Sequence, residues 1–143
     1  MKRKFLSILL TLAMVLTLLP VSAMAADGDV AEVDGTGYSA LVNAINAAGT
    51  GKTVKLLADI TGRTEIPAGK DIVLDLNGKT MSHTGTTLYN SGTLVVKDSS
   101  AGKTGKIVST GNVGICVNHN STTTIEYANI EAREGAVITG YAT

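Results

Sequence analysis

Short runs of alternating apolar and polar residues recur from Thr53 onward, separated by turns rich in Gly, Asn and Ser. Runs of roughly four to eight residues with this alternation are typical of β-strands that bury one face. Four of them share the same strand-then-turn form: Thr53–Ala58, Asp71–Leu76, Thr93–Lys97 and Thr122–Tyr127. The pattern therefore predicts a repeated, strand-based unit.

Two further apolar positions follow these first strands at near-constant spacing. They are Met81, Ile107 and Ile130 for a second strand, and Leu88, Ile115 and Ile138 for a third. The repeat thus has three short strands in about 20 to 30 residues, as in solenoid proteins. Stacked parallel strands about 4.8 Å apart would place Ile, Leu and Val inside, with Thr, Lys and Asp facing water. The repeat favours an all-β coil of parallel strands over residues 53–143.

An antiparallel β-sandwich is the alternative fold. Asn77-Gly78 is typical of a two-residue hairpin turn. The strands on either side of this pair are poorly matched in length, however, and the three-strand repeat would then be accidental. A βαβ architecture is disfavoured because no helical segment lies between the strands.

The first 25 residues follow a different pattern. Basic residues 2–4 precede the apolar stretch Phe5–Leu19, and Pro20 and a small-residue site ending at Ala25 come next. This arrangement predicts a signal peptide, residues 1–25, cut after Ala25. A retained membrane anchor is the alternative, but the stretch is shorter than the roughly 20 residues that span a bilayer. We therefore expect a secreted or cell-surface protein with no membrane segment after cleavage.

Two segments connect the leader to the strands. Residues 26–37 are acidic and contain Gly, which predicts a flexible linker. Residues 38–52 are predicted to form an N-terminal capping helix, with Ser39 as its N-cap and Gly49 as its stop signal. Its apolar stripe consists of Leu41, Val42, Ile45 and Ala48.

Composition excludes several classes of function. Without residues 1–25, nine Lys and Arg remain against 12 Asp and Glu, a net charge of −3, so there is no basic excess for nucleic acid. The single Cys116 excludes a disulfide framework; its apolar neighbours predict a buried thiol, with an exposed thiol that pairs with another chain as the alternative. His83 and His119 form no zinc-ligand pattern and no hydrolase triad, so we assign no catalytic residue and no metal ligand.

Three segments, Ile66–Gly78, Leu94–Ser100 and Gly102–Ile107, together with the preceding helix, resemble a known fold family. They are similar to right-handed parallel β-helix domains of the pectin-lyase-like kind, found in secreted or cell-surface proteins of Gram-positive gut bacteria. The resemblance implies about three coils, with the helix covering the open strand edges of the first coil. It also implies an N-terminal fragment of a longer solenoid, truncated at the C-terminal end.

Enzymes with this fold carry acidic clusters, or Asp with His, on one exposed face. The corresponding candidates here are Asp75, Asp98 and Glu126, each near the end of a first strand. If the repeats align, these three side chains project from one face as a ligand-binding site for calcium or sugar; the other interpretation is that they only solubilise the surface. No motif supports calcium, so no cofactor is predicted.

The sequence therefore predicts an exported, non-catalytic surface, adhesive or structural module that binds an extracellular polysaccharide or a host or bacterial surface protein. The alternative is the N-terminal part of a polysaccharide lyase or glycoside hydrolase acting on uronate-containing polysaccharide. About three coils would give a rod only some 15 Å long, too short for a cleft with several sugar subsites. The uncovered last coil also predicts edge-to-edge self-association, so purified residues 26–143 should be marginally stable, oligomeric or sticky.

Overall fold

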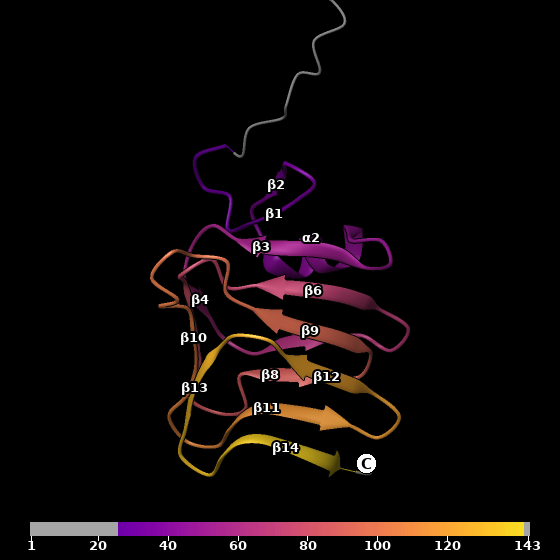
Figure 1. Cartoon of the computed structure of the whole chain (residues 1–143), viewed down its shortest axis with the longest axis vertical. Helices are drawn as coiled ribbons and strands as arrows, with labels where there is room; N and C mark the ends of the chain where they lie inside the picture. Colours follow the sequence, from indigo (N-terminus) through magenta and orange to yellow (C-terminus); the bar gives the residue numbers. More distant parts are fainter. Residues whose placement is uncertain (1–25, 142–143) are drawn as a thin grey trace, which may run out of the picture.

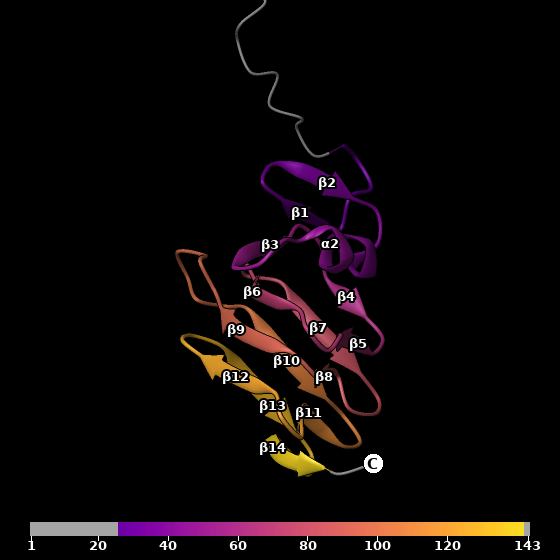
Figure 2. The same ribbon diagram turned by 90° about the vertical axis from the view of Figure 1, so that its right-hand side faces the viewer.

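The computed structural model describes residues 26–141; the predicted signal peptide lies outside them. The strands wind into a β-helix of about four turns, with three strands in each turn (Figures 1 and 2). The strands of successive coils are β3 (Lys52–Leu56), β4 (Ile60–Thr61) and β5 (Thr64–Ile66); β6 (Asp71–Asp75), β7 (Thr80–His83) and β8 (Leu88–Asn90); β9 (Thr93–Lys97), β10 (Lys106–Ser109) and β11 (Val113–Asn118); β12 (Thr122–Ile125), β13 (Asn129–Ala132) and β14 (Gly135–Tyr141).

Each strand of the coils pairs in parallel with the equivalent strand of the next coil. Three sheets result: β12-β9-β6-β3, β13-β10-β7-β4 and β14-β11-β8-β5, the first extended by two N-terminal strands. The predicted parallel β-helix is confirmed, and the antiparallel sandwich is wrong. Asn77 and Gly78, with φ angles of 47° and 76°, form a corner between β6 and β7, not a hairpin turn.

The number of coils is one higher than the sequence predicts. The additional coil is the first one, whose strands β4 and β5 have only two and three residues. These strands contribute one apolar residue each, Ile60 and Ile66, which is too few to be recognised as a repeat.

The core consists of columns of stacked side chains. Each column is made of inward-facing residues at equivalent positions in successive coils. In the second sheet, Ile60, Met81, Ile107 and Ile130 are stacked in register. Val54, Leu74, Val96 and Ile125 form the equivalent column of the first sheet. Full burial of each such side chain contributes about 1.5–3 kcal/mol, so these columns supply much of the stability of the coil.

The N-terminal segment is folded, and the prediction of a flexible linker over residues 26–37 is wrong. β1 (Ala31–Val33) and β2 (Thr36–Tyr38) form an antiparallel hairpin, and β1 also pairs antiparallel with β3. Asp34 and Gly35 both have positive φ, as a tight two-residue hairpin requires. Ala31 and Val33 are buried, so even a three-residue alternation is enough to dock this strand on the first coil.

The single helix of the described residues, α2 (Leu41–Ala47), is shorter than the predicted 38–52. Ala40 occupies the N-cap position without a side-chain hydrogen bond, so the assignment of Ser39 as N-cap is wrong. The helix buries Leu41, Ala44 and Ile45 and packs against β1, β2 and β5 at the N-terminal end of the coil.

The C-terminal end of α2 is held by Lys70, from the corner between the first and second coils. Its Nζ donates hydrogen bonds to the carbonyl oxygens of Asn46, at 2.7 Å, and Ala48, at 2.9 Å. A cation at this end of a helix satisfies otherwise unpaired carbonyl groups and complements the helix dipole. Lys70 therefore stabilises the C-terminal end of α2.

A buried asparagine joins two stacked corners between the third and first sheets. Asn90 is fully buried, and its Nδ2 donates to the Thr122 carbonyl oxygen and to Thr123 Oγ1, each at 2.8 Å. Its Oδ1 accepts a hydrogen bond from the Gly92 N–H at 2.9 Å. The side chain thus links the corner after β8 to the first strand of the last coil.

Asn90→Ala is expected to destabilise the fold by about 1–3 kcal/mol, because the Gly92 N–H and the Thr122 carbonyl oxygen lose a buried partner. Urea unfolding followed by circular dichroism measures this change in the free energy of unfolding. Asn43→Ala, on an exposed position of α2, is the control and should change stability by less than about 0.5 kcal/mol. Equal effects of the two substitutions would contradict the role assigned to Asn90.

Candidate functional site

Asp98 accepts more hydrogen bonds than either of the other two candidate acids. Only 2% of the residue is exposed. Its Oδ1 accepts hydrogen bonds from the backbone N–H groups of Gly78 and Ser100, both at 2.9 Å, and its Oδ2 accepts one from Gly105 at 2.6 Å. The carboxylate therefore fastens both ends of the loop between β9 and β10 and ties that loop to the corner of the preceding coil.

The last residue of this loop, Gly105, has to be a glycine. A Cβ at Gly105 would lie 2.6 Å from Leu76 Cβ and 2.8 Å from Asp98 Oδ2. Only a residue without a side chain lets the backbone N–H approach the buried carboxylate this closely.

Opposing effects act on the Asp98 carboxyl group. Burial alone would raise its pKa, but the hydrogen bonds from Gly105, Ser100 and Gly78 stabilise the ionised form and hold the pKa below its ordinary value of 3.8. A carboxylate kept ionised by backbone donors is a structural anchor, and it is poorly suited to act as a general acid.

Asp75 has a similar role one coil earlier. It is 3% exposed, and its Oδ1 accepts hydrogen bonds from the backbone N–H groups of Asn77, at 3.0 Å, and Ser99, at 2.8 Å. Asp75 and Asp98 therefore hold the same loop from two sides, without presenting their carboxylates to solvent.

Glu126 is the only exposed member of the predicted trio. The expectation that all three acids project from one solvent-facing surface is therefore wrong. Asp75 lies opposite Lys97 in the parallel register of β6 and β9, whereas Asp98 comes one residue later, where the chain points the other way. The sequence spacing aligned Asp98 with Asp75, but the residue that pairs with Asp75 is Lys97. Asp98 is therefore one residue out of register with Asp75 and faces the other way.

The outer face of the first sheet carries a column of alternating charge that the sequence pattern did not reveal. Glu32 lies opposite Lys55, Lys55 opposite Asp75, and Asp75 opposite Lys97, with Glu126 directly after the last pair in register. Lys55 Nζ lies 3.5 Å from Glu32 Oε1. Opposite charges on neighbouring strands contribute only about 0.2–1 kcal/mol per pair, so the column mainly favours the correct register.

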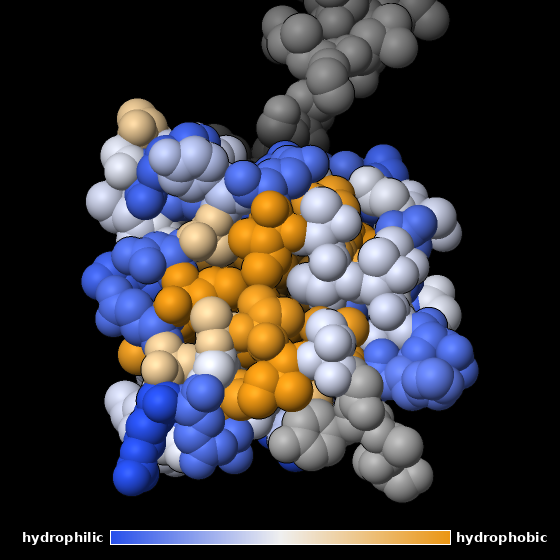
Figure 3. Space-filling model, turned by 60° about the horizontal axis from the view of Figure 1, so that its bottom comes forward, coloured by the Kyte–Doolittle hydropathy of each residue, from blue (hydrophilic) through white to orange (hydrophobic). Residues whose placement is uncertain are grey.

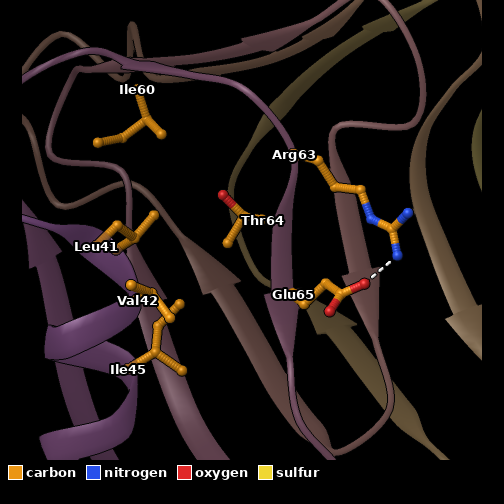
Figure 4. A pocket seen from close by; sticks show the side chains of 7 residues that line it. All are labelled: Leu41, Val42, Ile45, Ile60, Arg63, Thr64 and Glu65. Atoms are coloured by element: carbon orange, nitrogen blue, oxygen red, sulfur yellow. Dashed lines mark hydrogen bonds and ion pairs between the residues drawn. The ribbon is translucent and has the colours of Figure 1, made fainter.

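A cavity of about 400 Å³ lies between α2 and the first coil (Figure 4). Leu41, Val42 and Ile45 of the helix form one wall, while Thr64 points toward them from β5. Arg63 extends away from the helix to an ion pair with Glu65, and its guanidinium lies 4.0 Å from the centre of the Tyr89 ring. The charged groups are thus already partnered, and the cavity offers mainly hydrocarbon, which suits packing and not catalysis.

The remaining reactive side chains are separated from one another. Cys116 is buried, which confirms the predicted buried thiol, and this burial raises the pKa of the thiol, partly offset by the charge of Arg63. His83 ends β7, and His119 lies in the turn before β12. Among residues 26–141, no group of three or more His, Cys, Asp or Glu side chains is arranged to hold a metal ion.

No helix within the part of the chain that the structure describes has the length and apolar character needed to cross a membrane. Comparisons with protein-family models, with curated proteins and with solved structures gave no match.

Asp98→Asn tests the structural role of the most buried acid. The substituted amide can place an NH₂ donor against the Gly105 N–H, so we expect a loss of about 1–3 kcal/mol in the free energy of unfolding. Glu126→Gln is the matched control, because the exposed side chain has no hydrogen-bond partner to lose in the described residues; its effect should stay within about 0.5 kcal/mol. A larger loss of stability from Glu126→Gln than from Asp98→Asn would contradict the structural role assigned to Asp98.

The stability difference between the wild type and Asp98→Asn should also depend on pH. Because the folded-state pKa of Asp98 is depressed, its contribution is fully present above the ordinary value of 3.8 and is lost as pH falls through the lower folded value. Urea titrations from neutral pH to below pH 3.8 should show the difference shrinking only in the acidic range. A difference that disappears near neutral pH would contradict this prediction.

Proposed function

We propose that the chain is an exported, non-catalytic β-helix module that acts as a rigid structural or adhesive element outside the cell. The observation that carries the proposal is that the carboxylates of Asp75 and Asp98 accept hydrogen bonds from backbone N–H groups of the β9–β10 loop and of the corner after β6. Of the three acids that the sequence singles out, Glu126 alone is exposed. Hydrolysis of a glycoside by the usual mechanism needs two acids, about 5–10 Å apart, on either side of the bond.

The resemblance to pectin-lyase-like β-helix domains of secreted and cell-surface proteins supports an extracellular location. The predicted cut after Ala25 would make Ala26 the first residue of the mature chain. The Ala26 backbone nitrogen lies 2.7 Å from Asp29 Oδ2, and both residues are at the surface. Cleavage would create an ammonium group at this position, where the Asp29 carboxylate can form an ion pair with it.

The outer face of the first sheet is the surface best suited to an extracellular ligand. It presents Lys55, Lys97 and Glu126 to solvent, together with the hydroxyl groups of Thr93, Thr122 and Thr124. Such a flat polar face makes weak contacts with a polysaccharide or a protein surface. Repetition of weak contacts on a surface that displays many copies raises the overall avidity by about 10²–10⁴-fold.

The alternative function is the N-terminal part of a lyase or hydrolase that acts on uronate-containing polysaccharide. The specific observation in its favour is the free carboxylate of Glu126, which stands at the end of the charged column next to Lys97. One acid beside one cation could assist elimination, but the other acids that the sequence singled out are engaged elsewhere.

Incubation with polygalacturonate separates these two functions. The full chain is expressed in a host that exports it, and mass spectrometry of the exported protein should give Ala26 as its first residue. We expect no release of reducing ends or unsaturated uronates, with or without added Ca²⁺, for the wild type and for Glu126→Gln alike. Product that the wild type forms and Glu126→Gln fails to form would overturn the non-catalytic proposal.

The same preparation tests adhesion. Beads coated with the exported protein should bind immobilised polygalacturonate or bacterial cells more strongly than the free protein does, by the multivalent factor given above. Lys97→Glu should weaken binding to the polyanion, and Lys79→Glu, away from the first sheet, serves as its control. If coated beads bind no better than uncoated beads, the adhesive part of the proposal is wrong and only the structural part remains.

A further inference from the structure

Asn77-Gly78 is the single Asn-Gly pair in the chain, and it forms the corner between β6 and β7. Asparagine is a chemically labile residue, and a following glycine makes it most prone to deamidation, because glycine has no Cβ to hinder attack by its backbone nitrogen. Both residues are half-buried, so water reaches the corner. Burial alone therefore does not protect this pair.

Deamidation proceeds through a cyclic imide. The Gly78 N–H loses its proton to a base, the nitrogen attacks Cγ of Asn77, and the Cγ–Nδ2 bond breaks to release ammonia. Water then opens the imide at either carbonyl group, which leaves aspartate or isoaspartate in place of the asparagine. The sum is the exchange of ammonia for water, so the reaction needs no oxidant or further reactant.

The folded corner binds both groups that take part in this reaction, and it binds them to different coils. The Gly78 N–H donates to Asp98 Oδ1 at 2.9 Å, in the coil that follows. Asn77 Nδ2 donates to the Leu56 carbonyl oxygen at 2.8 Å, in the coil that precedes. The attacking nitrogen and the leaving group are thus held toward opposite ends of the β-helix.

The Asp98 carboxylate also opposes the first step. Removal of the proton would leave a negative nitrogen 2.9 Å from a carboxylate oxygen, and the repulsion of like charges is strong where a carboxylate is only 2% exposed. Because backbone donors hold the pKa of Asp98 below its ordinary value, the carboxylate stays ionised at the neutral and alkaline pH at which deamidation is fast.

The peptide group of the corner has little room to turn. A Cβ at Gly78 would lie 3.2 Å from Ser100 Cβ and 3.3 Å from Thr104 Oγ1, so the β9–β10 loop packs directly against this glycine. The Lys79 N–H closes the turn on the Leu76 carbonyl oxygen at 2.8 Å. Rotation of the peptide group toward the asparagine side chain therefore requires the loop to move away first.

We propose that Asn77 is a deamidation site that is closed in the folded chain and opens when the β9–β10 loop leaves the corner. Asp98 is the residue that keeps the site closed. The proposal rests on the corner alone and is independent of the proposed function.

The products of the reaction cannot rebuild the corner. An aspartate in place of Asn77 has no amide donor for the Leu56 carbonyl oxygen and turns a carboxylate toward it. An isoaspartate adds a methylene group to the main chain, which displaces β7 from its parallel register with β4 and β10. Each opening of the corner thus exposes the chain to a change that prevents it from closing again.

Peptide mapping by mass spectrometry measures the reaction. The exported full chain is incubated at mildly alkaline pH, either folded or in urea, and the mass gain of the peptide that contains Asn77 is followed. The folded chain should react at least about a hundredfold more slowly, which corresponds to an opening free energy of about 2.8 kcal/mol. Asn120, in the exposed turn before β12, is the internal reference, and its rate should differ much less between the two conditions.

Asp98→Asn should accelerate deamidation of Asn77 in the folded chain at least about tenfold, a change of roughly 1.4 kcal/mol, because the Gly78 N–H loses its charged acceptor. Asn90→Ala is the matched control, since it removes buried hydrogen bonds from a different corner. It should leave the rate at Asn77 close to that of the wild type. Circular dichroism shows whether each variant is folded.

Amide hydrogen exchange tests the first step without a substitution, because exchange removes the same proton from the same nitrogen. The Gly78 N–H should exchange more slowly than the Ser121 N–H, which donates to the Asn118 carbonyl oxygen at 3.2 Å in the turn before β12. Faster exchange at Gly78 than at Ser121 would contradict the closed state of the site.

The proposal is wrong if the folded wild type deamidates at Asn77 as fast as the chain in urea does, or if Asp98→Asn leaves that rate unchanged. It is equally wrong if Asn90→Ala accelerates the reaction as much as Asp98→Asn does. Global unfolding, and not release of the corner from Asp98, would then be the route to the reactive state.

Discussion

The structure depends on one constraint: each inward side chain must lie directly above the inward side chain of the next coil. The column Ile60, Met81, Ile107 and Ile130 shows it most clearly, since the four residues occupy equivalent positions in four short strands. A shift of one residue in any strand would turn its apolar set outward. Differences in length between coils must therefore be confined to the corners, where no stacked column is disturbed.

The corners consequently need their own polar interactions. Asp98 and Asp75 fasten the longest insertion, between β9 and β10, while Asn90 joins the corners on the opposite side. These groups are buried and satisfied, so their removal costs more than an exposed hydrogen bond would. Because Asp75 and Asp98 are used to close this loop, their carboxylates do not form a pair open to solvent on the first sheet.

The sequence predicted the parallel coil well because the strand repeat is a direct consequence of the stacking constraint. It did not predict the N-terminal hairpin, since Ala31 and Val33 are too few to form a visible pattern and their partner β3 is distant along the chain. The sequence also did not predict that the Asp98 side chain is buried against a loop. An acid at the end of a strand has the same spacing whether it faces solvent or a loop, and only the insertion after Asp98, with Gly105 returning to its carboxylate, decides between them.

The two ends of the β-helix differ in how far their strand edges are covered within the described residues. At the first coil, α2 and the hairpin cover the strand edges with residues that are close in sequence, and Lys70 secures the helix from below. At the last described coil, the three inward columns reach Ile125, Ile130 and Val137, which are less buried than the residues above them. Figure 3 shows a hydrophobic area at this end of the molecule. Because a coil offers the same geometry to whatever lies below it, a surface that completes these columns must present apolar side chains at a strand spacing of about 4.8 Å. Another β-helix coil meets that requirement directly.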